Sequence, residues 1–397
     1  MNNFLICLLF ILIIILSLVC INFKSYYFIK NGGHDKLQNS KLKLQNSKLK
    51  LQNDKLQNDK KLTYSISGND GLDYSVLRQL LNDHSFVECV TTTPYVDLSW
   101  GIVDVINITN YKNEFYTQKA NLKSIFTALD TNKFTQKDLL PMTAKKYNIN
   151  LLQFLPESKL LIDVKSTNNK ILIVKAGISF GQKGVQIITN DKELYNAKKR
   201  FNPQYTIVST YIRNPLLWKG KKFHLRPFIL VYYDGKQIHC FHKIYHRVLT
   251  AHQEYKQSDW LNTDIHISGG KNTSEMIKWP DDFNLSKEML ATCNHSLNSC
   301  IKEICKMIEK ILPKPYPEST SAFELFGPDI MLDETGHAWL LEINKKCGFG
   351  RLNNDNLELW DEYNKKLSQE FFSWILDTVV FKHFNVVATG RPTGLIV

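Results

Sequence analysis

The sequence predicts an α+β protein that is preceded by a membrane anchor and a low-complexity tether. From about residue 62, strand-length apolar stretches and helical stretches alternate irregularly, whereas a doubly wound sheet would alternate regularly. Before residue 62, an uncharged apolar run is followed by a lysine-rich repeat. We therefore expect an anchor over 1–23, a basic heptad-repeat linker over 24–62, an N-terminal lobe over 63–135, a central lobe over 136–212 and a C-terminal lobe over 213–397.

The N-terminal anchor is predicted from residues 4–23, which are apolar and uncharged. A run of this length can cross the ~30 Å hydrocarbon layer of a membrane as a helix. No basic residue precedes it and no small-residue cleavage site follows it, so we expect an uncleaved anchor. Lys24 and Lys30 follow the run, which places the folded domain on the cytosolic side by the positive-inside rule. The sequence thus predicts a single-pass membrane protein.

The linker repeats a unit that begins Lys-Leu-Gln-Asn between residues 36 and 56. Its leucines are spaced five and two apart, which favours a basic low-complexity tether over a coiled coil. Residues 24–62 hold ten lysines and three aspartates, so they carry most of the net charge of +12. This distribution favours contact with an anionic membrane surface, and we expect no nucleic-acid binding.

In the folded part, local patterns predict helices and strands in an irregular order. We expect helices over 76–82, 121–130, 136–147 (with Thr135 as its cap), 288–312 (ending before the prolines at 313–317) and 357–384. We expect strands over 94–100, 170–175, 185–189, 205–212, 225–233 and 238–245.

Two apolar strands near the C-terminus carry an informative set of polar residues. Asp329 lies on the first, while Glu342 and Asn344 lie two apart on the second and so share a face. A buried carboxylate needs a cation or hydrogen-bond partners. Three oxygen ligands suit Mg²⁺, which fills its shell with phosphate and water. The pattern predicts a magnesium site for nucleotide chemistry, and core-like residues on both strands argue against the alternative, a solvated edge hairpin.

The turn between these strands decides whether the carboxylates meet. A two-residue turn at Thr335 and Gly336 places Asp329 directly opposite Glu342, about 5 Å away at Cβ. A three-residue turn would shift the register by one and send Asp329 to the other face. We expect the two-residue turn.

Residues 171–175 read as a buried strand that ends in Lys175, and a glycine-rich loop and a second strand follow. Gly177, Gly181 and Gly184 would let backbone amides approach phosphate, and Lys175 would supply a point charge. The glycine spacing matches neither a P-loop nor a dinucleotide-binding fold. Alone, the loop fits a phosphate site and a plain glycine hairpin equally.

A third pattern is the alternation of Lys222, His224 and Arg226 along a strand, which places them on one face. Three converging basic groups suit a triphosphate, or a carboxylate undergoing activation. The alternative is a solvated basic edge strand.

Six segments in order resemble the tubulin–tyrosine ligase-like family, whose members are ATP-grasp enzymes that join amino acids to proteins through amide bonds. The first three are Asp-Leu-Ser-Trp at 97–100, Phe-Thr-Gln-Lys-Asp-Leu-Leu at 134–140, and Ile-Val-Lys at 173–175 with its glycine loop. The others are Asn-Pro-Leu-Leu through Lys-Phe-His-Leu-Arg at 214–226, Phe-Glu-Leu-Phe-Gly-Pro-Asp at 323–329, and Leu-Leu-Glu-Ile-Asn at 340–344.

The resemblance implies an ATP-grasp fold formed by the central and C-terminal lobes. It implies ATP and Mg²⁺ as cofactors, with a free amino acid and an acidic, tubulin-like protein tail as partners. It assigns ATP contacts to Lys137, Lys175, Gly177, Gly181, Lys183, Gly184, Tyr211, Ile212 and Lys222. It assigns a catalytic role to Lys222, Arg226 and Arg247, and Mg²⁺ coordination to Asp329, Glu342 and Asn344. The implied reaction passes through an acyl phosphate.

The chain departs from the family pattern at several positions. His224 replaces an acid, Ser209 and Thr210 replace a Gln-Lys pair, and Gly269 replaces an asparagine. Two hypotheses follow. The first is an active ligase that performs tyrosination, glutamylation or glycylation, and the second is a catalytically inactive ligase-like protein that binds an acidic protein tail at a membrane.

Overall fold

The computed structural model describes residues 61–67, 74–90, 92–101, 119–124, 128–177, 184–269, 277–312, 321–345, 368–386 and 395–396. Its contacts divide the chain into one unit over Met1–Lys61 and a second over Leu62–Val397. The predicted anchor and nearly all of the predicted linker lie outside the described residues. The three lobes predicted within the second unit stay a prediction.

The prediction of a single-pass membrane protein needs correction. Within the part of the chain that the structure describes, no helix is both long enough and apolar enough to cross a membrane. The 25-residue helix α8 (Lys287–Ile311) has the length, but it is amphipathic and carries charged residues along its exposed side. The apolar run at 4–23, which led to the prediction, lies outside the described residues.

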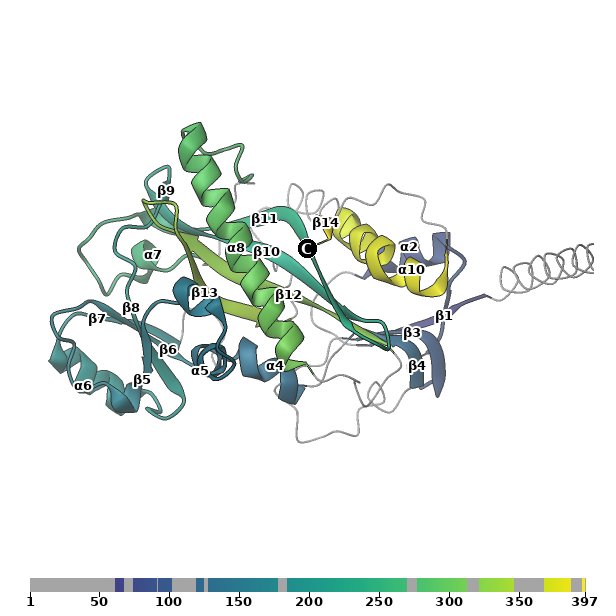
Figure 1. Cartoon of the computed structure of the whole chain (residues 1–397), viewed down its shortest axis with the longest axis horizontal. Coiled ribbons are helices and arrows are strands. Elements are labelled where there is room, and N and C mark those ends of the chain that lie inside the picture. The colour runs from purple at the N-terminus through teal and green to yellow at the C-terminus, as the bar shows by residue number, and fades with distance from the viewer. Residues whose placement is uncertain are drawn as a thin grey trace, which may run out of the picture. The chain divides into compact units, whose positions relative to one another are not determined.

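A ten-stranded sheet forms the frame of the second unit (Figure 1). Its order is β14-β11-β10-β12-β4-β3-β1-β2, with β13 also paired to β12 and β9 to β10. The strands are β1 (Thr63–Ser67), β2 (Val87–Glu88), β3 (Tyr95–Gly101), β4 (Lys119–Lys123), β9 (Leu217–Trp218), β10 (Lys221–Tyr233), β11 (Ile238–Glu254), β12 (Ala322–Leu332), β13 (Ala338–Lys345) and β14 (Leu395–Ile396). The pairs β11–β10, β10–β12 and β12–β13 are antiparallel. The pairs β12–β4, β4–β3, β3–β1 and β1–β2 are parallel.

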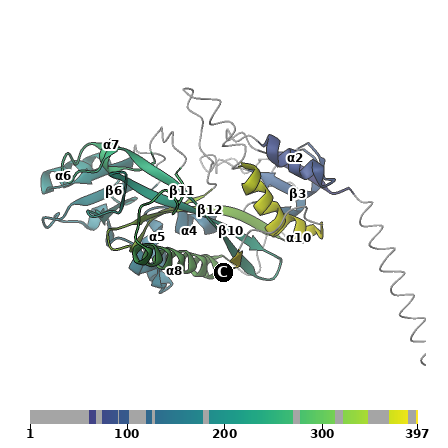
Figure 2. The same cartoon turned by 90° about the horizontal axis from the view of Figure 1, so that it is seen from above.

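Strand β10 contributes to a different apolar core on each of its faces. Leu225 and Ile229 belong to the core that includes α8, whereas Phe228 and Leu230 belong to the core that includes the helix at 368–384. Figures 1 and 2 show α8 running along the sheet, and α2 (Ser75–Asp83) and α10 (Phe381–Phe384) together at the end formed by β1 and β3. Because side chains alternate, the face of β10 that carries Phe228 also carries its even-numbered basic residues.

A second, four-stranded antiparallel sheet has the order β5-β8-β6-β7 and its own small core. Its strands are β5 (Ser158–Leu160), β6 (Leu172–Ala176), β7 (Val185–Ile188) and β8 (Thr206–Thr210). Helix α6 (Asp191–Arg200) packs on this sheet through Leu194 and Ala197. Its N-terminus is capped by Asn190, whose side chain accepts a hydrogen bond from Glu193 N (2.9 Å).

Residues 119–147 fold differently from the prediction. In place of the helix expected over 121–130, the chain forms β4 and then α4 (Ala128–Thr135). Thr135 ends α4 and donates to the Thr131 carbonyl (3.0 Å), so it does not cap the next helix, α5 (Leu139–Lys146), whose N-cap is Asp138. Pairing of β4 with β3 and with Ala322 of β12 overrides the local helical pattern.

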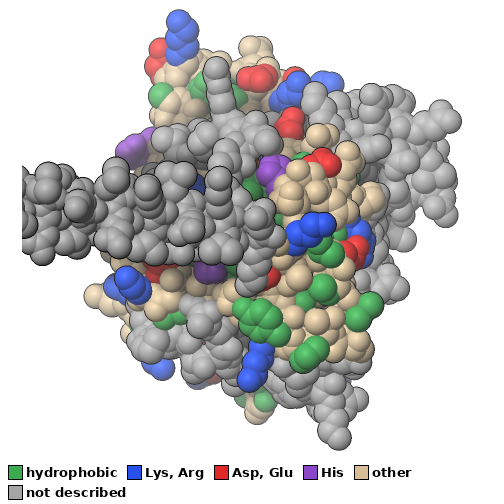
Figure 3. Space-filling model, turned by 90° about the vertical axis from the view of Figure 1, so that its right-hand side faces the viewer, with side chains coloured by type: hydrophobic (Ala, Val, Ile, Leu, Met, Phe, Trp, Pro, Cys, Tyr) green, Lys and Arg blue, Asp and Glu red, His purple; other side chains and the backbone are tan. Residues whose placement is uncertain are grey.

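The other predicted elements lie close to those observed, although β10 and β11 are longer than expected. The predicted closing helix is described from residue 368 and includes a π-helical turn at Leu376–Val380, while 357–367 lie outside the described residues. The remaining elements are short: η2 (Asn150–Phe154), η3 (Leu161–Asp163) and α7 (Thr263–His266). On the face shown in Figure 3, basic side chains are interspersed with acidic and apolar ones.

Candidate functional site

The β12–β13 hairpin places Asp329 opposite Glu342, as the sequence predicted. The turn, however, has three residues between the closing pair and not two. Asp333 N donates to the His337 carbonyl (3.0 Å), and Gly336 adopts a left-handed backbone with a φ of 82°. The expected two-residue turn is therefore wrong, although the pair of carboxylates that it was meant to produce is present.

A β-bulge at Leu341 restores the register. Ile330 pairs with Leu340 and Asp329 pairs with Glu342, so Leu341 is the extra residue on β13. Without the bulge, Asp329 would face Leu341, and the two carboxylates would lie on different faces of the sheet. The longer turn and the bulge thus compensate each other.

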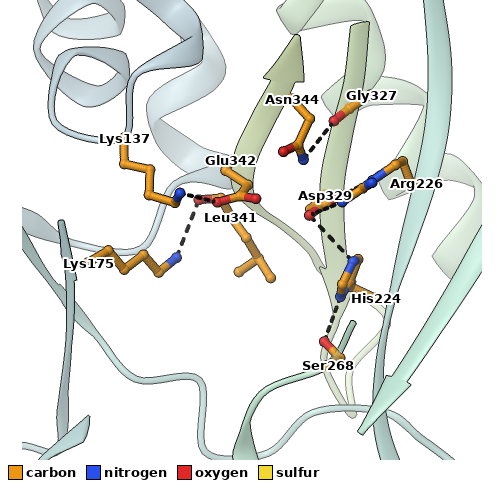
Figure 4. Close-up of polar contacts among 10 residues, drawn as sticks. All are labelled: Lys137, Lys175, His224, Arg226, Ser268, Gly327, Asp329, Leu341, Glu342 and Asn344. Carbon is orange, nitrogen blue, oxygen red and sulfur yellow. Dashed lines mark hydrogen bonds and ion pairs between the residues drawn. The ribbon is translucent and has the colours of Figure 1, made fainter. Parts of the chain in front are cut away.

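Asn344 lies two residues beyond Glu342 and opposite Gly327. Its amide nitrogen donates to the Gly327 carbonyl (3.3 Å), and Figure 4 shows the amide oxygen turned away from that bond. Asp329, Glu342 and Asn344 therefore lie together on one face of two paired strands.

Asp329 is a buried carboxylate that contacts two side chains of β10, Arg226 and His224 (Figure 4). Arg226 donates to it twice, from Nε at 2.6 Å and from Nη2 at 2.8 Å, and His224 Nε2 lies 3.4 Å from Oδ2. Burial alone would raise the pKa of Asp329, but the charges of Arg226 and His224, with hydrogen bonds from Arg226 and Asn344, lower it to about 2. Asp329 is therefore ionised at neutral pH.

Glu342 faces two lysines on the other side of the site (Figure 4). Lys137 Nζ lies 3.0 Å from Glu342 Oε2, and Lys175 Nζ donates to the carbonyl of the bulged Leu341 (3.3 Å). Burial lowers the pKa of Lys175 to about 8; Glu342 and Asp329 oppose this shift and Lys137 adds to it. The bulge thus also provides an acceptor for Lys175.

Lys222 is buried on the face of β10 that carries His224 and Arg226. Its Nζ donates to the hydroxyl of Tyr211 (2.9 Å). Burial, with the charge of Lys175 as a second cause, lowers the pKa of Lys222 to about 7. The basic strand predicted from the sequence is therefore an interior strand, and it is not a solvated edge.

The remaining predicted residues are placed as follows. Arg247 lies directly opposite Arg226 in the β10–β11 pair, and Ile212 is half-buried next to Tyr211. Gly184 is buried immediately before β7. Two further predicted nucleotide contacts, Gly181 and Lys183, lie outside the described residues.

Gly177 is required by close packing at the end of β6. A Cβ at this position would lie 2.5 Å from Asp138 Oδ1 and 2.6 Å from the Tyr205 carbonyl, to which the Gly177 amide donates (2.7 Å). The absence of a side chain therefore lets β6 approach the start of α5. This packing explains the glycine without reference to phosphate, whose contact with Gly177 stays a prediction.

A pocket opens beside Lys137 and Lys175. It is also lined by Leu140, Pro141, Leu155, Pro156, Ser158, Ile207, Ser209, Leu340 and Leu341. The hydroxyls of Ser158 and Ser209 lie 2.7 Å apart, and Ser158 donates to the Pro156 carbonyl (2.6 Å). Sequence reasoning missed Ser158, because only the β5–β8 pairing brings it to Ser209, 51 residues along the chain.

Two of the departures from the family pattern, His224 and Gly269, lie next to each other in the structure. A Cβ on Gly269, which has a φ of 94°, would lie 3.3 Å from Cε1 of His224. His224 Nδ1 in turn lies 2.5 Å from the hydroxyl of Ser268. The absence of a side chain at 269 therefore leaves room for the imidazole at 224. This relation could not be seen in the sequence, because the two residues are far apart along the chain.

The donor atoms at 329, 342 and 344 fit Mg²⁺. Among the described residues, no three His, Cys, Asp or Glu side chains form a metal-binding group, and the set here consists of two carboxylates and one amide. Each oxygen of Asp329 accepts one bond from Arg226, and Oδ2 also lies 3.4 Å from His224 Nε2. Because Mg²⁺ usually takes one or two carboxylates together with substrate phosphates, this donor set is sufficient.

Comparison with known proteins identifies the family. The model of the tubulin-tyrosine ligase family matches residues 103–367, so the chain belongs to this family. Tubulin glycylase 3E of Tetrahymena thermophila is 24% identical over 306 residues, covering 70% of this chain and 21% of the relative. Tubulin polyglutamylase TTLL5 of Mus musculus is 25% identical over 322 residues, covering 71% and 23%.

A third relative is the probable alpha-tubulin polyglutamylase Ttll1 of Tetrahymena thermophila, which is 24% identical over 195 residues. That match covers 45% of this chain and 44% of the relative. The chain therefore spans less than half the length of each of these three relatives.

Proposed function

We propose that the protein is an ATP- and Mg²⁺-dependent ligase that joins an amino acid to a protein through an amide bond. Membership of the family supports a ligase, and similar proteins are named as tubulin glycylases and polyglutamylases. The observation that carries the proposal is the pairing of Asp329 with Glu342 between cations from three parts of the fold. These cations are Lys137 before α5, Lys175 on β6, and Lys222 and Arg226 on β10.

ATP fits the distribution of polar and apolar groups around this pair. The pocket beside Lys137 and Lys175 is lined by seven apolar residues and two hydroxyls, groups that a purine base would contact, and it would have to widen to admit one. The two lysines at its edge would meet the phosphates as point charges. Lys175, held by the Leu341 carbonyl, already lies at the boundary between the pocket and the carboxylates.

Asp329, Glu342 and Asn344 would hold Mg²⁺ through their side-chain oxygens. When bound, Mg²⁺ supplies positive charge that neutralises the phosphate oxygens during transfer. The protein keeps the two carboxylates in position through ion pairs, Arg226 with Asp329 and Lys137 with Glu342.

The proposed reaction has two balanced steps. A substrate carboxylate oxygen bonds to the γ-phosphorus of ATP while the bridging P–O bond breaks, which gives an acyl phosphate and ADP. An α-amino nitrogen then bonds to the acyl carbon while the C–O bond to phosphate breaks, which gives the amide, phosphate and a proton. Lys222, Arg226 and Arg247 would face the oxygens that gain negative charge in both steps.

The proposed acceptor is an acidic, tubulin-like protein tail, and the proposed donor is a free amino acid such as glycine, glutamate or tyrosine. The printed names of the relatives support tubulin as the acceptor. Among the described residues, the site has two carboxylates and a larger number of basic side chains. This excess of positive charge also favours negatively charged substrates.

Thermal unfolding with and without nucleotide tests the proposal. We expect Mg-ATP to raise the Tm of the wild type, because a ligand that binds only the folded state stabilises it. Glu342→Gln should lose most of the part of this shift that depends on Mg²⁺. A matched control is Glu88→Gln, which breaks the exposed ion pair of Glu88 with Arg78 (2.8 Å) and should keep the full shift.

Two results would count against the proposal in different ways. Equal stabilisation of the wild type and Glu342→Gln by Mg-ATP would overturn the assignment of Glu342 as a metal ligand. If neither ATP nor Mg-ATP stabilised the wild type, the use of ATP itself would be overturned.

A further inference from the structure

Aromatic side chains surround Lys222, and the proposed reaction assigns them no role. Its Nζ is 4.1 Å from the ring centroid of Tyr211 and 5.9 Å from that of Tyr255. The ring of His266 packs edge-on against both tyrosines, and Trp260 stacks on His266 at 4.9 Å. Lys222 is only 4% exposed, so these neighbours and not water set the direction of its side chain.

A hydrogen-bond chain runs from Lys222 through Tyr211 and His266 to the Ser258 carbonyl. The Ser258 carbonyl can only accept, so His266 Nε2, at 3.0 Å, carries a proton. Burial lowers the pKa of His266, so its other nitrogen is an unprotonated acceptor. The Tyr211 hydroxyl can therefore donate to His266 Nδ1 (2.9 Å), with the Tyr255 hydroxyl as a second hydrogen-bond neighbour, and its oxygen accepts from Lys222 Nζ (2.9 Å).

The chain ties together three elements that surround the proposed nucleotide site. Lys222 lies on β10, Tyr211 follows β8 of the small sheet, and His266 ends the short helix α7. Burial also raises the pKa of Tyr211, so the phenol stays protonated and keeps its role as a donor to His266. Since an ammonium has three donors, the bond to Tyr211 fixes where the other two point.

We propose that Tyr211 and His266 are positioning residues that aim the Lys222 ammonium at the phosphates of the nucleotide. This inference rests on the proposed use of ATP and goes beyond it, because it assigns a role to a histidine that does not itself touch substrate. The charge of Lys175 acts on Lys222, and two buried cations that repel each other favour the binding of a polyanion.

The two nitrogens of His266 allow the positioning role to be separated from a structural one. Asparagine places its oxygen near the position of Nδ1, so His266→Asn can keep the acceptor for Tyr211 but loses the bond to the Ser258 carbonyl. Glutamine reaches the position of Nε2, so His266→Gln can keep the bond to Ser258 but loses the acceptor for Tyr211. A positioning role predicts that asparagine rescues ATP binding, whereas a role limited to holding the loop predicts that glutamine does.

The experiment is a titration of the full-length protein with Mg-ATP by calorimetry, with thermal unfolding of each variant to check that it folds. We expect Tyr211→Phe and His266→Gln to weaken ATP affinity about tenfold, as for a lost hydrogen bond to a charged group, and His266→Asn to stay within about twofold of the wild type. The control is Tyr232→Phe, which removes an equivalent bond from a tyrosine hydroxyl to His383 Nδ1 (2.8 Å) and should leave the affinity unchanged. In steady-state assays, the KM for ATP should rise and the KM for the amino acid should not.

Each outcome is decisive. If the wild type binds ATP and His266→Gln binds it as well as His266→Asn does, the positioning role is overturned while the proposed function stands. If the wild type does not bind ATP, both are overturned. If Tyr211→Phe does not fold, the two His266 variants still decide, because apart from one methylene group they differ in which bond they retain.

Discussion

At the residue scale, the site is a group of buried charges that are only partly matched by one another. Asp329 is paired with Arg226 and Glu342 with Lys137, whereas Lys222 donates to a neutral phenol. A buried ammonium without a carboxylate partner costs stability, and the lowered pKa of Lys222 reflects that cost. Lys222 therefore lowers the stability of the folded protein, and its proposed contact with phosphate would account for its presence.

This cost gives a pH-dependent prediction for Lys222→Met. The lysine has a pKa of about 7 in the folded protein and about 10.4 when unfolded, so the unfolded chain binds more protons between these values and stability rises with pH. The cost of the buried charge is thus present at pH 7 and disappears as the pH rises towards 10. We expect Lys222→Met to raise the free energy of unfolding by about 1–4 kcal/mol at pH 7 and by less at pH 10, measured by urea unfolding.

The control for this measurement is Lys199→Met on α6, where the side chain is exposed over the Tyr195 ring (4.2 Å). It should change the free energy of unfolding little at either pH. A Lys222→Met variant that is destabilised at pH 7, or whose effect does not depend on pH, would show that Lys222 does not bear a buried charge.

Some of these residues could be predicted from the sequence and some could not. The alternation of Lys222, His224 and Arg226 was sufficient to place them on one face, because strand geometry has a period of two. Their contacts were not predictable, since Asp329 is 103 residues beyond Arg226 and meets it only through the β10–β12 pairing.

At the element scale, the β12–β13 hairpin determines whether the site exists. Its three-residue turn and its bulge at Leu341 are both irregular, and only together do they bring Asp329 opposite Glu342. The bulge also turns a carbonyl towards Lys175. A bulge re-aims backbone groups in this way because the extra residue leaves the regular ladder.

Deleting Leu341 separates these two effects. The deletion regularises the ladder and keeps Asp329 opposite Glu342, but it removes the carbonyl that holds Lys175. We expect a cooperatively folded protein whose ATP affinity is lower by about tenfold, since hydrogen bonds to charged groups contribute ~1.5 kcal/mol or more. Urea unfolding and ATP titration measure the two properties; unchanged ATP affinity in a folded deletion variant would contradict this role of the bulge.

The elements that sequence reasoning misplaced were those set by distant partners. The segment at 121–130 has a helical pattern, but β4 forms there because β3 offers a parallel neighbour. The pairing of Asp329 with Glu342 was predicted correctly, although the predicted turn was one residue too short. The bulge that compensates for the longer turn has no local signal in the sequence. Helix α8 was predicted well, since its periodicity and its serine cap at Ser286 are both local.

At the scale of the whole second unit, the site combines groups from both sheets. Lys175 comes from the small sheet, whereas Arg226, Asp329 and Glu342 come from the large one. The order of motifs indicated the family, but the way in which the two sheets meet depends on contacts far apart in the sequence. The chain also spans less than half of each relative described above, so its acceptor and amino acid are proposals.

The most direct measurement is mass spectrometry of purified tubulin after incubation with the full-length protein, Mg-ATP and glycine, glutamate or tyrosine in turn. We expect that one of these amino acids is added to the acidic tubulin tails, that the addition requires ATP and releases ADP, and that Glu342→Gln abolishes it. If the wild type binds tubulin and Mg-ATP but adds none of them, the ligase is contradicted and a catalytically inactive, tail-binding member of the family takes its place.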